Sequence, residues 1–163
     1  QGDAPLTPEW FVEDLIRSFE KNPSTQVATP VLRLDDRSLK EFRLDRKSGR
    51  VGGTTVVSDN NSNALYFSKE IIPYFDEKHI KLKENCPVFH HVGVYAYRPK
   101  TLLNYTLWKE SNLEVLEGLE QLRFLENGNS IKCVSVESKG RLFWELNNPA
   151  DVKRIEKAIN ENQ

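Results

Sequence analysis

The sequence lacks several features that would assign it to well-known classes of protein. It contains no methionine and two cysteines, Cys86 and Cys133, which have neither the spacing of metal ligands nor a CxxC arrangement. Such cysteines are usually buried small hydrophobic residues, so we expect neither a disulfide framework nor a redox-active dithiol. No hydrophobic run approaches the roughly 20 residues that span a bilayer, and no secretory signal is visible. We therefore expect a cytoplasmic protein with no membrane partner.

An excess of charge of either sign is also absent. Lys and Arg total 23 and Asp and Glu total 24, which gives a formal net charge of −1. This balance provides no electrostatic footprint for a nucleic-acid backbone, so nucleic acid is not expected among the partners. Hydrophobic residues make up 38% and charged residues 29% of the 163 positions, an ordinary composition for a folded domain with its own core. We expect residues 1–163 to form a single domain.

Helical and strand patterns alternate along the chain. Apolar residues recur at helical spacing after Thr7 and again after Ser111, whereas runs rich in Val, Thr and Leu indicate strands. This alternation predicts an α/β fold with a mostly parallel sheet. We expect helices over 7–22, 36–42, 99–107, 111–128 and 148–159, strands over 26–34, 54–58, 64–68, 88–97 and 131–136, and loops over 45–53 and 76–85.

The first candidate site is the opening motif Gln1-Gly2-Asp3-Ala4-Pro5. An Asp in a turn with Gly and Pro usually caps the turn. At the carboxyl edge of an α/β sheet it instead faces the ligand, and a preceding Gly lets the backbone approach a phosphate. Mg²⁺ prefers one or two carboxylates together with phosphate oxygens, so Asp3 is a candidate metal ligand. The strand that would deliver Asp3 is missing, so we expect a carboxyl-terminal portion of a larger enzyme.

The second candidate site is the segment HHVGVYAYR. On a strand, His91, Gly93, Tyr95 and Tyr97 share one face, and Gly93 leaves room there for a ligand or another backbone. This pattern favours a polar binding wall. The alternative is a half-buried strand whose polar tips are satisfied within the protein.

The third candidate site is the segment SNLEVLEGLEQLR. Ser111 and Glu114 form a capping box at the start of a helix. Glu114, Glu117 and Gln121 then lie on one side of that helix at spacings of three and four residues. They either contact a ligand or form a solvated face opposite the leucines.

These segments together resemble the CMP-3-deoxy-manno-octulosonate synthetases, the cytidylyltransferases that activate a 2-keto sugar acid for lipopolysaccharide. The resemblance is carried by QGDAP, NALYFSKEIIPY, HHVGVYAYRP, SNLEVLEGLEQLRFLENG and NNPADVKRI, in that order. It implies a nucleotide-diphospho-sugar-transferase-like, Rossmann-like three-layer fold with a mixed, mostly parallel sheet, and a homodimer. It also implies Mg²⁺-dependent transfer of CMP from CTP to the anomeric hydroxyl of the sugar acid, with release of pyrophosphate.

The resemblance implies a role for particular residues. Asp3 and Lys69 would act in catalysis, Asp3 as a Mg²⁺ ligand and Lys69 by holding the sugar carboxylate where the family usually has Arg. The second metal position of the family falls on Asn147, an amide in place of a carboxylate, and Glu145 is a possible substitute for it. The residues implied to bind substrate are Gln1, His91, Tyr95, Glu114, Glu117 and Gln121.

Other departures from the family pattern keep alternatives open. The Gly- and Lys-rich phosphate-binding segment that precedes QGD in the family is absent from this sequence, so the chain by itself is expected to be inactive on CTP. The family's QGDEP reads QGDAP, which removes a carboxylate at Ala4. An amino-substituted octulosonate or a nonulosonic acid is therefore an alternative substrate, and a catalytically inactive homologue acting as a dimeric scaffold is a further alternative.

Overall fold

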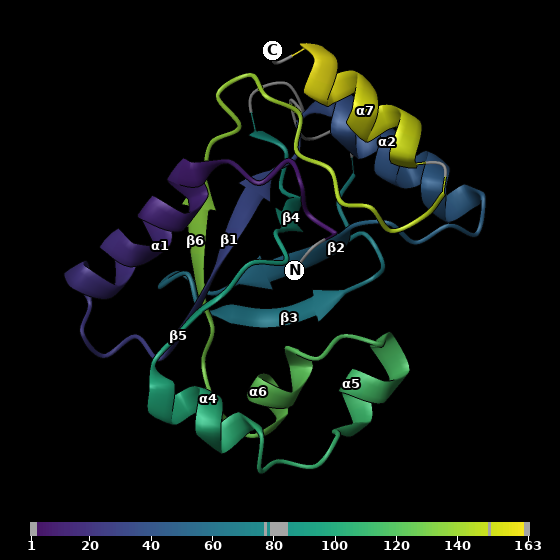
Figure 1. Cartoon of the computed structure of the whole chain (residues 1–163). Helices are drawn as coiled ribbons and strands as arrows, with labels where there is room; N and C mark the ends of the chain where they lie inside the picture. Colours follow the sequence, from purple (N-terminus) through teal and green to yellow (C-terminus); the bar gives the residue numbers. More distant parts are fainter. Residues whose placement is uncertain (1–2, 77, 79–84, 150, 162–163) are drawn as a thin grey trace.

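A computed structural model of the chain describes residues 3–76, 78, 85–149 and 151–161, arranged around one curled sheet (Figure 1). Gln1 and most of the predicted loop 76–85 lie outside these residues. The strands follow the order β3-β2-β4-β1-β5, and β6 pairs with the other edge of β1. The strands are β1 (Val27–Arg33), β2 (Thr54–Ser58), β3 (Ala64–Ser68), β4 (Phe89–His91), β5 (Ala96–Tyr97) and β6 (Lys132–Val136).

The sheet is mixed, as predicted, but it is not mostly parallel in the part of the chain that the structure describes. Only β1 and β6 pair in parallel. The pairings of β1 with β4 and β5, and of β2 with β3 and β4, are all antiparallel. The expectation was wrong because alternating sequence patterns do not report strand direction. The turn at 59–63, for example, is too short for the crossover that parallel strands need, so β2 and β3 run antiparallel.

The predicted strand 88–97 is broken between His91 and Ala96. It faces Pro30 in the middle of β1, and a proline has no backbone N–H to donate to a neighbouring strand. Val92 N–H still donates to the Pro30 carbonyl at 3.0 Å, but Val94 N–H then turns back to the Val92 carbonyl at 2.7 Å. Residues 92–95 therefore leave the sheet in a tight turn between β4 and β5.

Helices cover both faces of the sheet. Alternate strand residues point to opposite faces, so Val31 packs in one cluster with Phe124, while Leu32 packs with Phe11 in another. Both cysteines are free thiols buried in the core, as predicted. In the described part, no helix is long and apolar enough to cross a bilayer. The helices are α1 (Glu9–Lys21), α2 (Asp36–Lys47), α4 (Pro99–Tyr105), α5 (Asn112–Glu117), α6 (Leu122–Glu126) and α7 (Asp151–Glu161).

Two helix predictions need correction. Helix α2 runs on to Lys47, so Asp45 lies buried on it and not in a loop. The predicted helix 111–128 is two helices, because Gly118 adopts φ +62° between α5 and α6, a left-handed conformation that glycine reaches without strain. The continuous leucine face expected there does not form, and Leu116 is 73% exposed.

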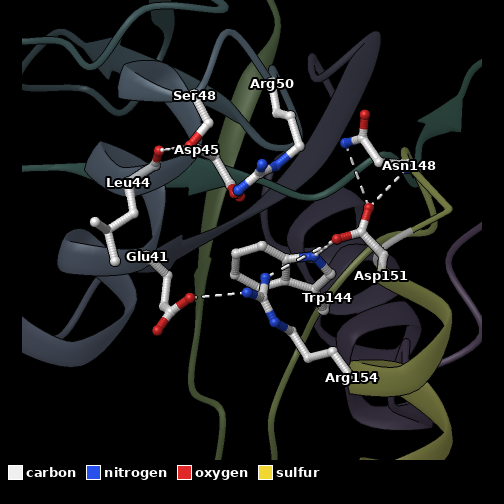
Figure 2. Close-up of polar contacts among 9 residues, drawn as sticks. All are labelled: Glu41, Leu44, Asp45, Ser48, Arg50, Trp144, Asn148, Asp151 and Arg154. Atoms are coloured by element: carbon white, nitrogen blue, oxygen red, sulfur yellow. Dashed lines mark hydrogen bonds and ion pairs between the residues drawn. The ribbon is translucent and has the colours of Figure 1, made fainter.

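Helices α2 and α7 lie side by side, and Trp144 joins them (Figures 1 and 2). Its indole Nε1 donates to Asp151 Oδ1 at 2.8 Å, while Arg154 lies over its ring at 4.0 Å from the centroid. Asp151 Oδ2 also accepts from the backbone N–H of Asn148 at 2.7 Å and of Asn147 at 3.1 Å. The buried carboxylate therefore holds the segment 144–148 against the start of α7.

We expect Asp151→Ala to lower the free energy of unfolding by about 2 kcal/mol, because the indole N–H of Trp144 and the backbone N–H groups of Asn147 and Asn148 lose their acceptor. Urea denaturation followed by far-UV circular dichroism measures this. Glu156→Ala, on the exposed face of the same helix, is the control and should change stability by less than about 0.5 kcal/mol. Equal stabilities of the two variants would contradict the role given to Asp151.

Candidate active site

A cavity of about 690 Å³ gathers residues that lie far apart in the sequence. Its walls come from the opening turn, the end of β3, the break between β4 and β5, the turn between α5 and α6, and the segment 145–147. Glu117 is not part of the lining, and Gln1 lies outside the described residues. The predicted site residues that line the cavity are Asp3, Lys69, His91, Tyr95, Glu114, Gln121 and Asn147.

Asp3 is held by its backbone while one side-chain oxygen is left without a partner. The Asp3 carbonyl accepts from Leu146 N–H at 2.7 Å, which ties the opening turn to the segment 145–147. Its Oδ1 atom is buried and has no hydrogen-bond partner among the described residues. A buried carboxylate oxygen without a partner is costly, so it calls for an explanation such as a bound ion. Asp3 therefore fits a cation ligand.

Glu145 occupies the same wall. Its Oε1 accepts from Gly93 N–H at 3.0 Å, and its Oε2 lies 4.0 Å from Nε2 of the buried His90. Burial raises the pKa of Glu145 and the nearby charge of Asp3 raises it further, although hydrogen bonds from Gly93 and Asn147 act in the opposite direction. The sequence offered Glu145 only as a substitute for Asn147, and the structure places both on the cavity.

His91 and Tyr95 form a hydrogen-bonded pair inside the cavity. The Tyr95 Oη atom lies 2.8 Å from His91 Nε2. Burial lowers the pKa of His91 to about 3 and raises that of Tyr95, so both groups are neutral near pH 7. They meet because the chain turns at residues 92–95 and not because they share one face of a regular strand. The pair can therefore offer neutral hydrogen bonds, but no charge, to a ligand.

Glu114 is engaged by another part of the protein. Its carboxylate accepts from Arg123 Nε at 2.7 Å and Nη2 at 2.5 Å, and from Ser111 N–H at 3.1 Å, which completes the predicted capping box. The hydrogen bond from Arg123 lowers the pKa of Glu114, so the pair remains ionised. Glu114 borders the cavity, but its main bonds hold α5 against α6.

Glu117 lies behind the cavity wall. Its Oε1 accepts from the Ser68 hydroxyl at 2.8 Å, and its Oε2 accepts from Lys69 N–H at 2.9 Å. These bonds fasten α5 to the end of β3 and fix the start of the Lys69 side chain. Helical spacing placed Glu114 and Glu117 on one side, but it could not reveal that each already has partners in the folded chain.

Gln121 and Lys69 present donors to the cavity. Gln121 is only 4% exposed, and its Nε2 has no hydrogen-bond partner among the described residues. Lys69 reaches across Gly118 so closely that a Cβ there would meet its Nζ at 2.6 Å. A buried amide donor and an ammonium group in one cavity suit the acceptor oxygens of an anionic or polyhydroxylated ligand.

Some lining residues have no signal in the sequence that could have identified them. Glu110 and Thr54 border the cavity from a loop and a strand end. Within the described part of the chain, no group of three or more His, Cys, Asp or Glu side chains is placed to hold a metal. A Mg²⁺ ion that also binds phosphate needs only one or two carboxylates, and Asp3 beside Glu145 provides such a partial set.

Comparisons with known proteins agree on one family. Residues 1–131 match the family model described as Cytidylyltransferase. The chain is 38% identical over 159 residues to a 3-deoxy-manno-octulosonate cytidylyltransferase of Maricaulis maris, covering 98% of this chain and 60% of that protein. It is 36% identical to the protein of the same name in Chlamydia caviae, covering 98% of this chain and 56% of that protein. The chain thus spans about 60% or less of the length of these curated relatives.

A solved structure gives the same result at the level of the fold. It is described as CMP:2-keto-3-deoxy-manno-octonic acid synthetase complexed with CTP, and it matches all of this chain and 61% of its own with a TM-score of 0.77 and 29% identity. The resemblance found in the sequence is therefore confirmed, and so is the nucleotide-sugar-transferase-like fold with its mixed sheet. The chain belongs to the cytidylyltransferase family.

Proposed function

We propose that the protein acts as a CMP-3-deoxy-manno-octulosonate synthetase, which transfers CMP from CTP to the anomeric hydroxyl of 3-deoxy-manno-octulosonate and releases pyrophosphate for lipopolysaccharide biosynthesis. The names of its relatives and of the CTP-bound structure support this. The observation that carries it is the unpaired, buried Oδ1 of Asp3 in a cavity that also presents Lys69 and Gln121. The proposal extends to Mg²⁺ dependence, a homodimer and a cytoplasmic location. Residues 1–163 would act as a single domain of the enzyme.

The residues of the cavity divide into a cation-binding side and a sugar-binding side. Asp3, with the adjoining segment 145–147, would hold Mg²⁺, which when bound neutralises charge on the phosphate and favours loss of the hydroxyl proton. On the other side, Lys69 pairs with the sugar carboxylate as a point charge, and Gln121 donates to a sugar oxygen. The neutral pair of His91 and Tyr95 lines the same cavity and would orient the sugar through hydrogen bonds.

An amino-substituted octulosonate or a nonulosonic acid is the second candidate substrate. The observation that favours an amino sugar is the acidic lining of the cavity, where Glu110, Glu120 and Glu145 accompany Asp3 but Lys69 is the only Lys or Arg in the described lining. An ammonium group on the sugar would be attracted to these carboxylates. Turnover of CTP with a panel of neutral and amino-substituted 2-keto sugar acids separates the two substrates.

The metal-binding role of Asp3 is tested by Asp3→Asn in the protein expressed from its complete coding sequence. We expect pyrophosphate release from CTP and octulosonate to fall by about 100-fold or more, the scale of losing a preorganised electrostatic contact at a reacting phosphate. Asp14→Asn is the matched control, because Asp14 pairs with Arg17 on the surface of α1 and should leave turnover unchanged. Near-normal turnover of Asp3→Asn would refute the assignment.

The sugar-binding role of Gln121 is tested by Gln121→Leu, which removes the buried amide and keeps the volume of the side chain. We expect the KM for the sugar acid to rise by about tenfold, since one lost hydrogen bond is worth about 1 kcal/mol or somewhat more. The KM for CTP, measured in the same steady-state assay, should stay within about twofold and is the internal control. A parallel rise in both constants would indicate a structural role.

A further inference from the structure

We infer that Glu145, and not Asn147, supplies the second carboxylate of a divalent-cation site that it shares with Asp3. The inference rests on the proposed function for the identity of the phosphate ligand that would complete the site. The cation site itself is argued from the placement of these residues. It assigns Asn147 a positioning role toward Glu145.

The two carboxylates lie on neighbouring stretches of backbone. The hydrogen bond of 2.7 Å from Leu146 N–H to the Asp3 carbonyl brings residue 3 alongside residues 145–147, and Asp3 and Glu145 both line the cavity. They are close enough for the charge of Asp3 to act on Glu145. Two like charges brought together in a partly buried wall repel each other, and a cation bound by both removes that repulsion.

Glu145 is oriented by neutral donors. Gly93 N–H donates to its Oε1 at 3.0 Å, and the backbone N–H of Asn147 donates to the Glu145 carbonyl at 3.1 Å. Within the described part of the chain, its one contact of ion-pair type is with His90 Nε2, at 4.0 Å, which is too long for a hydrogen bond. The Glu145 side chain is thus held in one orientation, without a hydrogen-bonded cationic partner among the described residues to neutralise its charge. Metal-binding carboxylates are oriented in this way by the groups around them.

Asn147 is less suited to bind the cation. The amide oxygen of Asn147 brings no negative charge. Asn147 is also exposed to solvent, whereas the Glu145 side chain is only 13% exposed. The backbone N–H of Asn147 donates to Asp151 at 3.1 Å, so its position follows from its bond to the first residue of α7. The bond from its backbone N–H to the Glu145 carbonyl, at 3.1 Å, therefore makes Asn147 a residue that positions Glu145.

A second feature of the cavity points independently to a ligand. Gln121 is 4% exposed, lines the same cavity, and has an Nε2 atom with no hydrogen-bond partner in the described residues. Leaving a buried amide donor unpaired is costly unless a ligand supplies an acceptor. An unpaired donor together with the unpaired oxygen of Asp3 suits a ligand that combines acceptor oxygens with a divalent cation.

The experiment measures Mn²⁺ binding by electron paramagnetic resonance, without nucleotide, on the protein expressed from its complete coding sequence. We expect E145Q to weaken Mn²⁺ binding by about 100-fold or more and N147A by about tenfold at most, since a lost ligand costs more than a change at a residue that positions the ligand. E120Q is the matched control, because it removes the same charge from an exposed side chain on the same cavity. It should leave Mn²⁺ binding nearly unchanged.

The inference would be overturned by an Mn²⁺ affinity that is unchanged in E145Q, or by a loss in N147A as large as in E145Q. A loss in E120Q equal to that in E145Q would overturn it as well, because binding would then follow only the total charge. Should E145Q fail to fold, Mn²⁺ added to the wild-type protein decides the matter by nuclear magnetic resonance. It should broaden the backbone amide signal of Gly93 strongly and leave that of Gly128 sharp, and an unaffected Gly93 signal counts against the site.

The outcome is separable from that of the proposed function. Mn²⁺ binding that depends on Glu145 in a protein that does not turn over CTP would uphold the cation site and refute the proposed reaction. Turnover of CTP by a protein whose Mn²⁺ affinity ignores E145Q would uphold the reaction and refute the site.

Discussion

The buried carboxylate of Asp151 is the interaction on which the arrangement of the cavity depends. It accepts from the Trp144 indole and from the backbone of Asn147 and Asn148, so it links the core to the segment that reaches the cavity. Trp144 in turn packs edge-on against Phe42 of α2, with ring centroids 5.8 Å apart. Leu146 then holds Asp3 through its backbone. The position of the candidate metal ligand is therefore set in part by packing between α2 and α7.

The carboxylates of this protein fall into two groups by the partners that the fold gives them. Glu114 has Arg123, and Glu117 has Ser68 and Lys69 N–H. Burying an ionised carboxylate is costly unless donors surround it, and these two are satisfied within the chain. Asp3 keeps a buried oxygen without a partner in the described residues. Satisfied carboxylates hold the helices in place, whereas an unsatisfied one marks where a ligand belongs.

A single proline shapes the remaining wall of the cavity. Pro30 in β1 offers no N–H to the strand beside it, and the chain turns away from the sheet at residues 92–95. That turn brings Tyr95 back onto His91 and aims the N–H of Gly93 at Glu145. The turn at residues 92–95 thus connects the sugar-binding and cation-binding sides of the cavity that we propose. Residues that were expected to lie along one face of a regular strand are instead brought together by this turn.

The sequence by itself determined the family and most of the helices and strands, and it identified most of the candidate residues that line the cavity. Short motifs such as QGDAP and HHVGVYAYRP made this possible, because their residue types indicate ligand binding without reference to distant parts of the chain. It also determined the start of α5, since the capping box is a local interaction of Ser111 with Glu114. Only the tertiary structure decided the direction of the strands, the break at residues 92–95 and which of the glutamates bind partners within the chain. These depend on partners distant in the chain, as Arg123 is for Glu114 and Gly93 for Glu145. Periodicity along a sequence indicates on which face of a helix or strand a residue lies, but not which residues of the folded chain contact that face.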